Sequence, residues 1–289
     1  MFDKVAIVGP GLIGGSMGMA LRKRGLAGTV VGIGRRQESL NKALEVGAID
    51  QATLDVEQGV TDADLVVLAT PIGTFEELTV RIAEFLRPES LLTDVASSKA
   101  RVVATITAAL RRRPDVAYIP SHPMAGSEQS GPLAASADLF EGCICIITPL
   151  TNTFPESKSQ IVSMWQALGA RVVSVSPQAH DRTVARISHL PHLAAAALVA
   201  ALDDADMKLC GKGLLDTTRV ASASTDLWMD ICETNRDQVH EALKAYIALL
   251  QELATSLEGG DLGQLRSMLE TAKDRRDRLV GDRQEHRTP

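Results

Sequence analysis

Aromatic residues are scarce in this sequence, in which Phe, Trp and Tyr together make up 3% of 289 residues. Proteins that bind single-stranded nucleic acid stack its bases on aromatic side chains, so this composition argues against that function. The formal net charge of −6 at pH 7 also opposes binding to a polyanion. Since 45% of the residues are hydrophobic, the apolar mass is mostly aliphatic, which is typical of helices packed on a parallel sheet.

Cysteine is also sparse, and none of the four cysteines forms a CxxC pair. Cys143 and Cys145 lie two residues apart in an apolar run, where strand periodicity places both side chains on one face. The pattern predicts reduced, buried thiols.

No hydrophobic run is long enough to cross a bilayer, since the longest covers residues 190–202 and contains Pro191 and His192. The chain passes from Met1 almost directly into a strand-like run at residues 5–8, which leaves no room for a secretory signal. We therefore expect a cytoplasmic protein that binds no membrane.

A glycine motif follows this first strand-like run directly. Gly9 permits a tight turn, Gly11 lets the backbone approach a pyrophosphate, and Gly14 lets a helix touch the strand. Leu12 and Ile13 lie at the start of the helical spacing that follows, where free N–H groups face bound phosphates. The motif predicts a dinucleotide site; the alternative is a glycine-rich turn kept only for packing.

The second strand-like run, residues 29–33, ends about twenty residues after the glycine motif, where NAD enzymes place an acid on the ribose. Here Gly34, Arg35 and Arg36 stand instead. Guanidinium groups can grip a 2′-phosphate, so we expect NADP as the preferred cofactor, with NAD possible if both arginines are only a solvated helix start. Thr70 and Pro71, which end the next run, are also expected at the cofactor.

Strand-like runs alternate with helical segments up to residue 175 and then stop at Pro177. This alternation predicts a parallel, doubly wound α/β sheet of the Rossmann type, whose ligand sites lie beyond the carboxyl ends of its strands. Ser97 and His122 both follow such ends. We expect a dinucleotide-binding domain over residues 1–176 and an all-helical substrate and dimerisation domain over residues 177–289.

His122 lies in a stretch rich in proline and glycine, residues 118–128, and is the candidate catalytic base. A histidine of ordinary pKa is largely unprotonated near neutral pH, so activity is expected to rise along an acid limb near pH 6 to 7. Ser97, at the neighbouring strand end, could meet His122 over one nicotinamide.

Three more polar residues mark the helical half. His189 and His192 are three apart and share a helix face; a metal is not expected, because no carboxylate or third histidine stands at ligand spacing. A substrate-facing pair is more consistent with the sequence, although a core or capping role for one of them stays open. Arg219 is either an ordinary surface charge or a grip for a carboxylate.

Apolar residues form a stripe over residues 238–257 and continue over residues 262–272. A helical half this small can cover such a stripe by pairing between two chains, which predicts a homodimer.

The motifs together resemble the prephenate/arogenate (cyclohexadienyl) dehydrogenases of tyrosine biosynthesis. The resemblance covers about residues 4 to 280 and rests on separated motifs in the family's order. These are Gly9-Pro-Gly-Leu-Ile-Gly-Gly-Ser16, Thr93-Asp-Val-Ala-Ser-Ser-Lys99, His122-Pro-Met-Ala-Gly-Ser-Glu128, Ser188-His-Leu-Pro-His192, and Asp216-Thr-Thr-Arg219 with Trp228.

The resemblance implies NAD(P)-dependent oxidative decarboxylation of prephenate to 4-hydroxyphenylpyruvate, or of arogenate to tyrosine. It implies that His122 is the base for the ring hydroxyl and that Ser97 orients this hydroxyl and the nicotinamide. It also implies that Arg219 clamps a carboxylate and that His192 contacts the substrate with His189 in support. No metal is required for this chemistry.

Glu128, near the His122 loop, could pair with the ammonium group of arogenate or could gate the pocket. Two alternatives to the whole assignment remain. One is a beta-hydroxyacid dehydrogenase of the 6-phosphogluconate type, for which Lys208 and Lys212 are the nearby lysine bases. The other is a non-catalytic NADP-sensing protein on the same fold.

Overall fold

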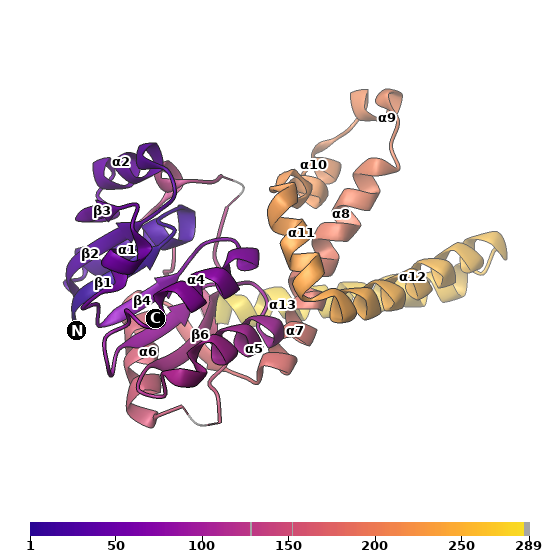
Figure 1. Cartoon of the computed structure of the whole chain (residues 1–289). Helices are drawn as coiled ribbons and strands as arrows, with labels where there is room; N and C mark the ends of the chain where they lie inside the picture. Colours follow the sequence, from indigo (N-terminus) through magenta and orange to yellow (C-terminus); the bar gives the residue numbers. More distant parts are fainter. Residues whose placement is uncertain (128, 152, 286–289) are drawn as a thin grey trace. The chain divides into compact units, whose positions relative to one another are not determined.

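The computed structural model describes residues 1–127, 129–151 and 153–285 (Figure 1). The chain forms two compact units, Met1–Arg236 and Asp237–Pro289. Glu128 falls in the gap between the first two described ranges, so its two expected roles stay predictions. No helix in the described part of the chain combines the length and the apolar character needed to cross a membrane.

The first unit is built on one eight-stranded sheet of order β3-β2-β1-β4-β5-β6-β7-β8. This mostly parallel sheet confirms the expected Rossmann-type architecture. The strands are β1 (Phe2–Val8), β2 (Ala27–Ile33), β3 (Gln51–Thr53), β4 (Leu65–Leu68), β5 (Leu91–Asp94), β6 (Ala117–Pro123), β7 (Ile144–Ile147) and β8 (Arg171–Ser174).

Helices cover both faces of this sheet because successive side chains in a strand point to opposite sides. On β1, Val5 and Ile7 pack in one core cluster, together with residues of helices α1 (Leu12–Lys23), α2 (Gln37–Glu45) and α6 (Pro155–Ala167). Ala6 and Val8 pack in the other, with residues of α3 (Val56–Val60), α4 (Phe75–Ile82) and α5 (Ala100–Ala109). Near-continuous apolar runs are therefore required in the central strands.

The sheet is not wholly parallel, which corrects the expectation from the sequence. β7 pairs antiparallel with β6, and β8 then pairs parallel with β7. The described residues between β6 and β7 contain a 3-10 turn, η3 (Pro132–Ala134), and no α-helix. A parallel neighbour needs a crossover, usually a helix, so a chain that stays at the carboxyl end of β6 must run back antiparallel.

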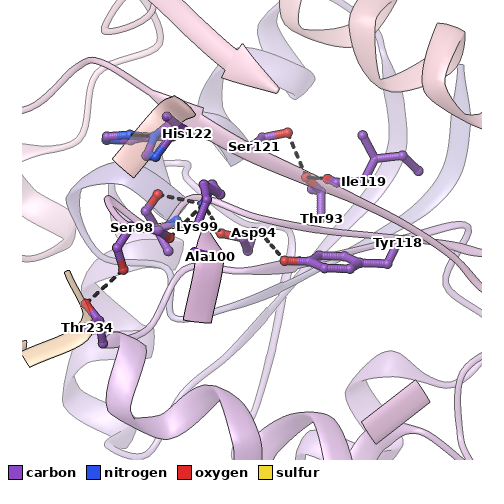
Figure 2. Close-up of polar contacts among 12 residues, drawn as sticks. Thr93, Asp94, Ser98, Lys99, Ala100, Tyr118, Ile119, Ser121, His122 and Thr234 are labelled. Carbon is purple, nitrogen blue, oxygen red and sulfur yellow. Dashed lines mark hydrogen bonds and ion pairs between the residues drawn. The ribbon is translucent and has the colours of Figure 1, made fainter. Parts of the chain in front are cut away.

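Polar side chains at the neighbouring ends of β5 and β6 form hydrogen bonds with one another. On one face a chain of hydrogen bonds has a fixed direction: the Trp165 indole N–H donates to Ser121 Oγ (3.1 Å), and Thr93 Oγ1 donates to the Ile119 carbonyl (2.7 Å). The 3.0 Å contact between Ser121 and Thr93 is then donated by Ser121 (Figure 2). All these side chains are buried, so the chain fixes β5 against β6 with satisfied hydroxyl groups.

After β8 the described elements of the first unit are helical. A π-helical turn, η4 (Ala185–His189), ends two residues before Pro191. Proline removes one N–H and its ring collides with the carbonyl four residues earlier, and a widened turn relieves both problems. The other elements are η1 (Ile72–Thr74), η2 (Leu110–Arg112), α7 (Pro177–Val184), α8 (Leu190–Ala200), α9 (Asp204–Lys208), α10 (Lys212–Thr218), η5 (Arg219–Ser222) and α11 (Thr225–Thr234).

The second unit consists of helices α12 (Arg236–Glu258) and α13 (Leu262–Glu285). The turn between them uses Gly260 at φ +66°, a left-handed conformation that favours glycine. Among the described residues of this unit, seven large apolar side chains are exposed to solvent in the single chain: Ile247, Leu249, Leu250, Leu257, Leu262, Leu269 and Leu279.

Candidate active site

The glycine motif forms the turn between β1 and α1. Gly9 has φ +92°, and a Cβ at this position would lie 2.8 Å from the Ala69 carbonyl oxygen. Gly11 has no atom within 4 Å of where its Cβ would be, so the space beside its backbone is open. In the described part of the chain, no side chain caps the start of α1 at Leu12 and Ile13. The turn therefore offers an open approach to free helix N–H groups, as a phosphate needs.

The motif borders a cavity of about 430 Å³ at the carboxyl edge of the sheet. Arg35 and Arg36 line this cavity beside Gly34, and Thr70 and Pro71 line it from the end of β4. The two arginines are exposed. The chemistry of this lining fits an NAD(P) dinucleotide, whose pyrophosphate would lie at the glycine turn.

His122 lies on an extended strand. The sequence indicated a strand ending near Ile119, but β6 continues to Pro123, and His122 pairs with Ile146 of β7. The strand can continue through Pro120, although proline has no N–H to donate, because the Pro120 carbonyl accepts a hydrogen bond from the Thr148 N–H at 3.0 Å. His122 is 8% exposed, so its ring lies in a largely closed environment.

A buried ionic cluster joins Lys99, Asp94 and Tyr118 in the segment that carries Ser97 (Figure 2). Lys99 is 0% exposed, and its Nζ donates to Asp94 Oδ1 (2.6 Å) and to the Ala96 carbonyl (2.7 Å). Tyr118 donates to the other Asp94 oxygen (2.7 Å). The cluster closes the loop between β5 and α5, so it fixes the backbone that carries Ser97.

Sequence reasoning missed a chain of polar groups behind His122. His122 Nδ1 lies 2.8 Å from His180 Nε2, and His180 Nδ1 lies 2.8 Å from Asp181 Oδ1. His180 and Asp181 belong to α7 and are buried. Among the described residues, His122 bonds to His180 and not to Ser97.

The protons in this chain have one consistent order. A carboxylate only accepts hydrogen bonds, so His180 Nδ1 must carry the proton that Asp181 accepts. The Nε2 of neutral His180 is then an acceptor, and His122 Nδ1 must donate to it. The second nitrogen of neutral His122, Nε2, is left without a proton and can accept one.

Asp181 is itself held by the start of α5. Its Oδ1 accepts from the Lys99 backbone N–H (2.7 Å) and its Oδ2 from the Ala100 backbone N–H (2.8 Å). A carboxylate at a helix N-terminus is stabilised by the free N–H groups and the helix dipole. Asp181 therefore stays a hydrogen-bond acceptor, as the proton order requires.

Burial keeps these imidazoles neutral. It lowers the pKa of His122 well below the ordinary value of 6.5, and the charge of Lys99 lowers it further. Burial also lowers the pKa of His180, against the opposing effect of Asp181, and it lowers the pKa of His189 to about 4. We therefore expect the acid limb at lower pH than the pH 6 to 7 that the sequence predicts.

The histidine pair of the helical segment surrounds one indole. The His192 ring stacks on Trp228 with centroids 3.5 Å apart, and the His189 ring meets Trp228 edge to face at 5.9 Å. Both histidines are buried, and His189 Nε2 and His192 Nδ1 have no hydrogen-bond partner among the described residues. Buried polar atoms are usually paired, so a ligand or water is expected to meet these two atoms.

Arg219 is exposed at the start of η5, and η5 packs against α8, the helix that carries His192. Ser97 is half-buried in the turn after β5. No group of His, Cys, Asp and Glu side chains in the described ranges is arranged to hold a metal ion. The residues that sequence reasoning left without a role are Asp94, Lys99, Tyr118, His180, Asp181 and Asn235; a polar motif at a strand end and an adjacent His-Asp pair were the available signals.

Comparison with known proteins gives a consistent result over nearly the whole chain. The family model described as prephenate dehydrogenase, nucleotide-binding domain, matches residues 17–174, and the model described as prephenate dehydrogenase, dimerization domain, matches residues 176–271. The chain is 34% identical to the prephenate dehydrogenase of Bacillus subtilis, with 96% of this chain and 76% of that protein covered.

Two solved structures are similar along the same length. The prephenate dehydrogenase of A. aeolicus, in complex with hydroxyphenyl propionate and NAD+, has a TM-score of 0.89 and 30% identity, covering 96% of this chain and 99% of that one. The arogenate dehydrogenase of Synechocystis has a TM-score of 0.80 and 30% identity, with the same coverage. The chain therefore belongs to the prephenate dehydrogenase family.

Proposed function

We propose that this enzyme catalyses the NAD(P)-dependent oxidative decarboxylation of prephenate or arogenate in tyrosine biosynthesis, with His122 as its base. The observation that carries the assignment of the base is the chain from His122 through His180 to Asp181, which leaves His122 Nε2 as an acceptor. Family membership supports the reaction class. The role of His122 rests on the geometry described above, whereas the roles of Ser97 and Arg219 rest on the resemblance of their motifs to those of the family.

His122 Nε2 accepts a hydrogen bond from the C4 hydroxyl of the substrate ring and takes up its proton as the C4 carbonyl character develops. The positive charge that appears on His122 is stabilised by Asp181 through the His180 ring. When the ring becomes aromatic, the proton returns to the phenolic oxygen. The balanced reaction of prephenate dianion with oxidised cofactor gives 4-hydroxyphenylpyruvate, carbon dioxide and reduced cofactor, and releases no net proton.

The bound nicotinamide supplies the acceptor for the hydride that leaves C4. The electrons of the broken bond between C1 and the carboxylate enter the ring, which makes the ring aromatic and drives the reaction. This chain's residues must therefore hold C4 and the C1 carboxylate in one geometry. We assign Ser97 to the C4 hydroxyl, and Arg219, His192 and His189 to the substrate carboxylates and side chain.

The enzyme uses an NAD(P) cofactor, and we propose NADP as the preferred form. Arg35 and Arg36 border the cavity where β2 ends, and neither they nor Gly34 offers the carboxylate that would pair with a ribose hydroxyl. A 2′-phosphate would gain two guanidinium partners there. The same two side chains would not exclude NAD.

The rival assignment to a beta-hydroxyacid dehydrogenase is not favoured. Its lysine base would have to be Lys208 or Lys212, and both are exposed at the ends of the short helices α9 and α10. A non-catalytic NADP-sensing role leaves the ordered chain from His122 to Asp181 without a use.

The proposed function is tested by kcat/KM for prephenate and arogenate, each with NADP and with NAD. We expect turnover with at least one substrate, with carbon dioxide and reduced cofactor in equal amounts. NADP should exceed NAD by about tenfold or more, since a charged hydrogen bond contributes about 1.5–3 kcal/mol. Absence of turnover with all four combinations would contradict the function.

The cofactor part has a matched control. Replacing Arg35 and Arg36 by serine should remove most of the NADP advantage while leaving kcat/KM with NAD within about twofold. Arg111 and Arg112 form another adjacent, exposed arginine pair. Their replacement by serine should leave kcat/KM with NADP and with NAD unchanged. An unchanged NADP preference in the variant that lacks Arg35 and Arg36 would show that both arginines are only solvated residues at the start of a helix.

We also propose that two copies of this chain form a homodimer. Exposed Leu250, Leu257, Leu262 and Leu269 are separated by seven, five and seven residues on two long helices, and the family model for this region is described as a dimerization domain. Burying such side chains is favourable by about 1.5–3 kcal/mol each. Sedimentation should give the mass of two chains, and the mass of one chain at micromolar concentration would remove the proposal.

A further inference from the structure

Asn235 is a buried amide between two active-site elements. It ends α11 as its C-cap residue and is 4% exposed. Its side-chain nitrogen, Nδ2, lies 2.9 Å from the backbone carbonyl oxygen of Asp181 and 3.2 Å from Nδ1 of His189. One amide nitrogen therefore contacts the segment behind His122 and the histidine pair around Trp228.

The orientation of this amide follows from its partners. A backbone carbonyl oxygen can only accept, so the Asn235 atom that faces Asp181 must be the NH2 group. This group has two hydrogens, and the second is directed to His189. Nδ1 of His189 is therefore the acceptor in that contact, and the single proton of the neutral ring is on Nε2.

The Nε2 atom of His189 needs an acceptor. It is buried and has no partner among the described residues, and the His189 ring is 1% exposed. The adjacent His192 presents a second buried nitrogen without such a partner, and the rings of both histidines contact Trp228. Two unpaired nitrogens around one indole point to a polar ligand at this place.

We propose that Asn235 is a positioning residue that fixes the tautomer of His189, so that Nε2–H donates a hydrogen bond to an oxygen of the substrate. The tautomer follows from the hydrogen bonds of Asn235 alone, whereas the identity of the acceptor as substrate rests on the proposed function. An acceptor oxygen of a carboxylate or carbonyl group is the chemistry that this donor recognises.

Asp181 thereby orders two imidazoles in opposite ways. Through its carboxylate and His180 it leaves Nε2 of His122 without a proton, and through its carbonyl and Asn235 it leaves Nε2 of His189 with one. The first ring becomes an acceptor for a hydroxyl, and the second becomes a donor for an oxygen anion. One residue of α7 therefore sets complementary roles for the two rings.

The tautomer is tested on the full-length protein by two-bond ¹H–¹⁵N spectra, which are tractable for six histidines. His189, identified by the loss of its signals in His189→Gln, should show the Nε2–H tautomer near pH 7. Asn235→Asp places an acceptor beside Nδ1, so the neutral His189 ring should there carry its proton on Nδ1. The same change at exposed Asn41 should leave the His189 signals in place. An Nδ1–H tautomer in the unaltered protein, or unchanged signals in Asn235→Asp, would overturn the inference.

The contact with substrate is tested separately, by binding of 3-(4-hydroxyphenyl)propionate to the protein with oxidised cofactor. Asn235→Asp should weaken its binding by about tenfold or more, the effect of losing a hydrogen bond to a charged group, while cofactor affinity stays within about twofold. A tautomer switch with unchanged affinity would overturn the donation to substrate. The spectra do not depend on turnover, so failure of the proposed function leaves the tautomer result interpretable.

Discussion

Replacing Asp181 by asparagine is expected to lower kcat by about 10²- to 10³-fold, because this carboxylate sets the proton order that makes His122 a base. Oδ1 of Asp181 accepts from His180 and from the Lys99 backbone N–H, and Oδ2 accepts from the Ala100 backbone N–H. An amide has only one oxygen, so at least one of these donors would face an NH2 group. Either orientation also removes the negative charge that stabilises protonated His122.

If the NH2 group faces His180, the whole chain reverses. His180 Nδ1 then accepts, its Nε2 carries the proton, and His122 must hold its own proton on Nε2, where the substrate hydroxyl should bind. KM and cofactor affinity should change much less than kcat, because no substrate contact is removed. Asp115→Asn, at an exposed carboxylate, should leave kcat unaltered. A kcat within about threefold of normal in Asp181→Asn, with the melting temperature preserved, would exclude the role.

Replacing His122 by asparagine is expected to lower kcat by about 10³-fold or more, since an amide cannot take up the hydroxyl proton. The variant should bind cofactor normally, because the glycine turn and the cavity at Arg35 and Arg36 do not involve His122. His240→Asn, at an exposed position on α12, is the matched control and should retain full turnover. Wild-type turnover in His122→Asn would refute the assignment of the base.

The pH dependence of the unaltered enzyme follows from the lowered pKa of His122. A lowered pKa keeps the ring neutral to more acidic pH, so kcat/KM should stay level from about pH 8 to about pH 6.5 and fall only below this range. A limb at or above pH 6.5 would show that His122 is not shielded as the buried site requires.

The nucleotide half was predictable because its signals are local. A glycine motif between an apolar run and a helical run is compatible with few conformations other than a strand-turn-helix. Its turn at Gly9 lies where the pattern predicts it. The direction of β7 was not predictable, because an apolar strand of four residues reads the same in either direction. The direction is decided by the absence of a crossover helix among the described residues between Pro123 and Ile144.

The chain behind His122 was not predictable for a related reason. His180 lies 58 residues after His122. The strand pattern ends near Pro177, which suggested a domain boundary at the segment where His180 in fact contacts His122. Lys99 belongs to a motif visible in the sequence, but lysine is almost never fully buried unless it is paired. Its partner Asp94 stands five residues earlier, a spacing that no helix or strand rule pairs.

The central claim is that His122 reaches the substrate with an unprotonated Nε2, and a two-bond ¹H–¹⁵N spectrum of its ring near pH 7 tests this most directly. The hydrogen bonds through His180 to Asp181 predict a neutral ring with its proton on Nδ1, and a shift of that proton towards Nε2 in Asp181→Asn. A proton on Nε2 of His122 in the unaltered enzyme would contradict the account.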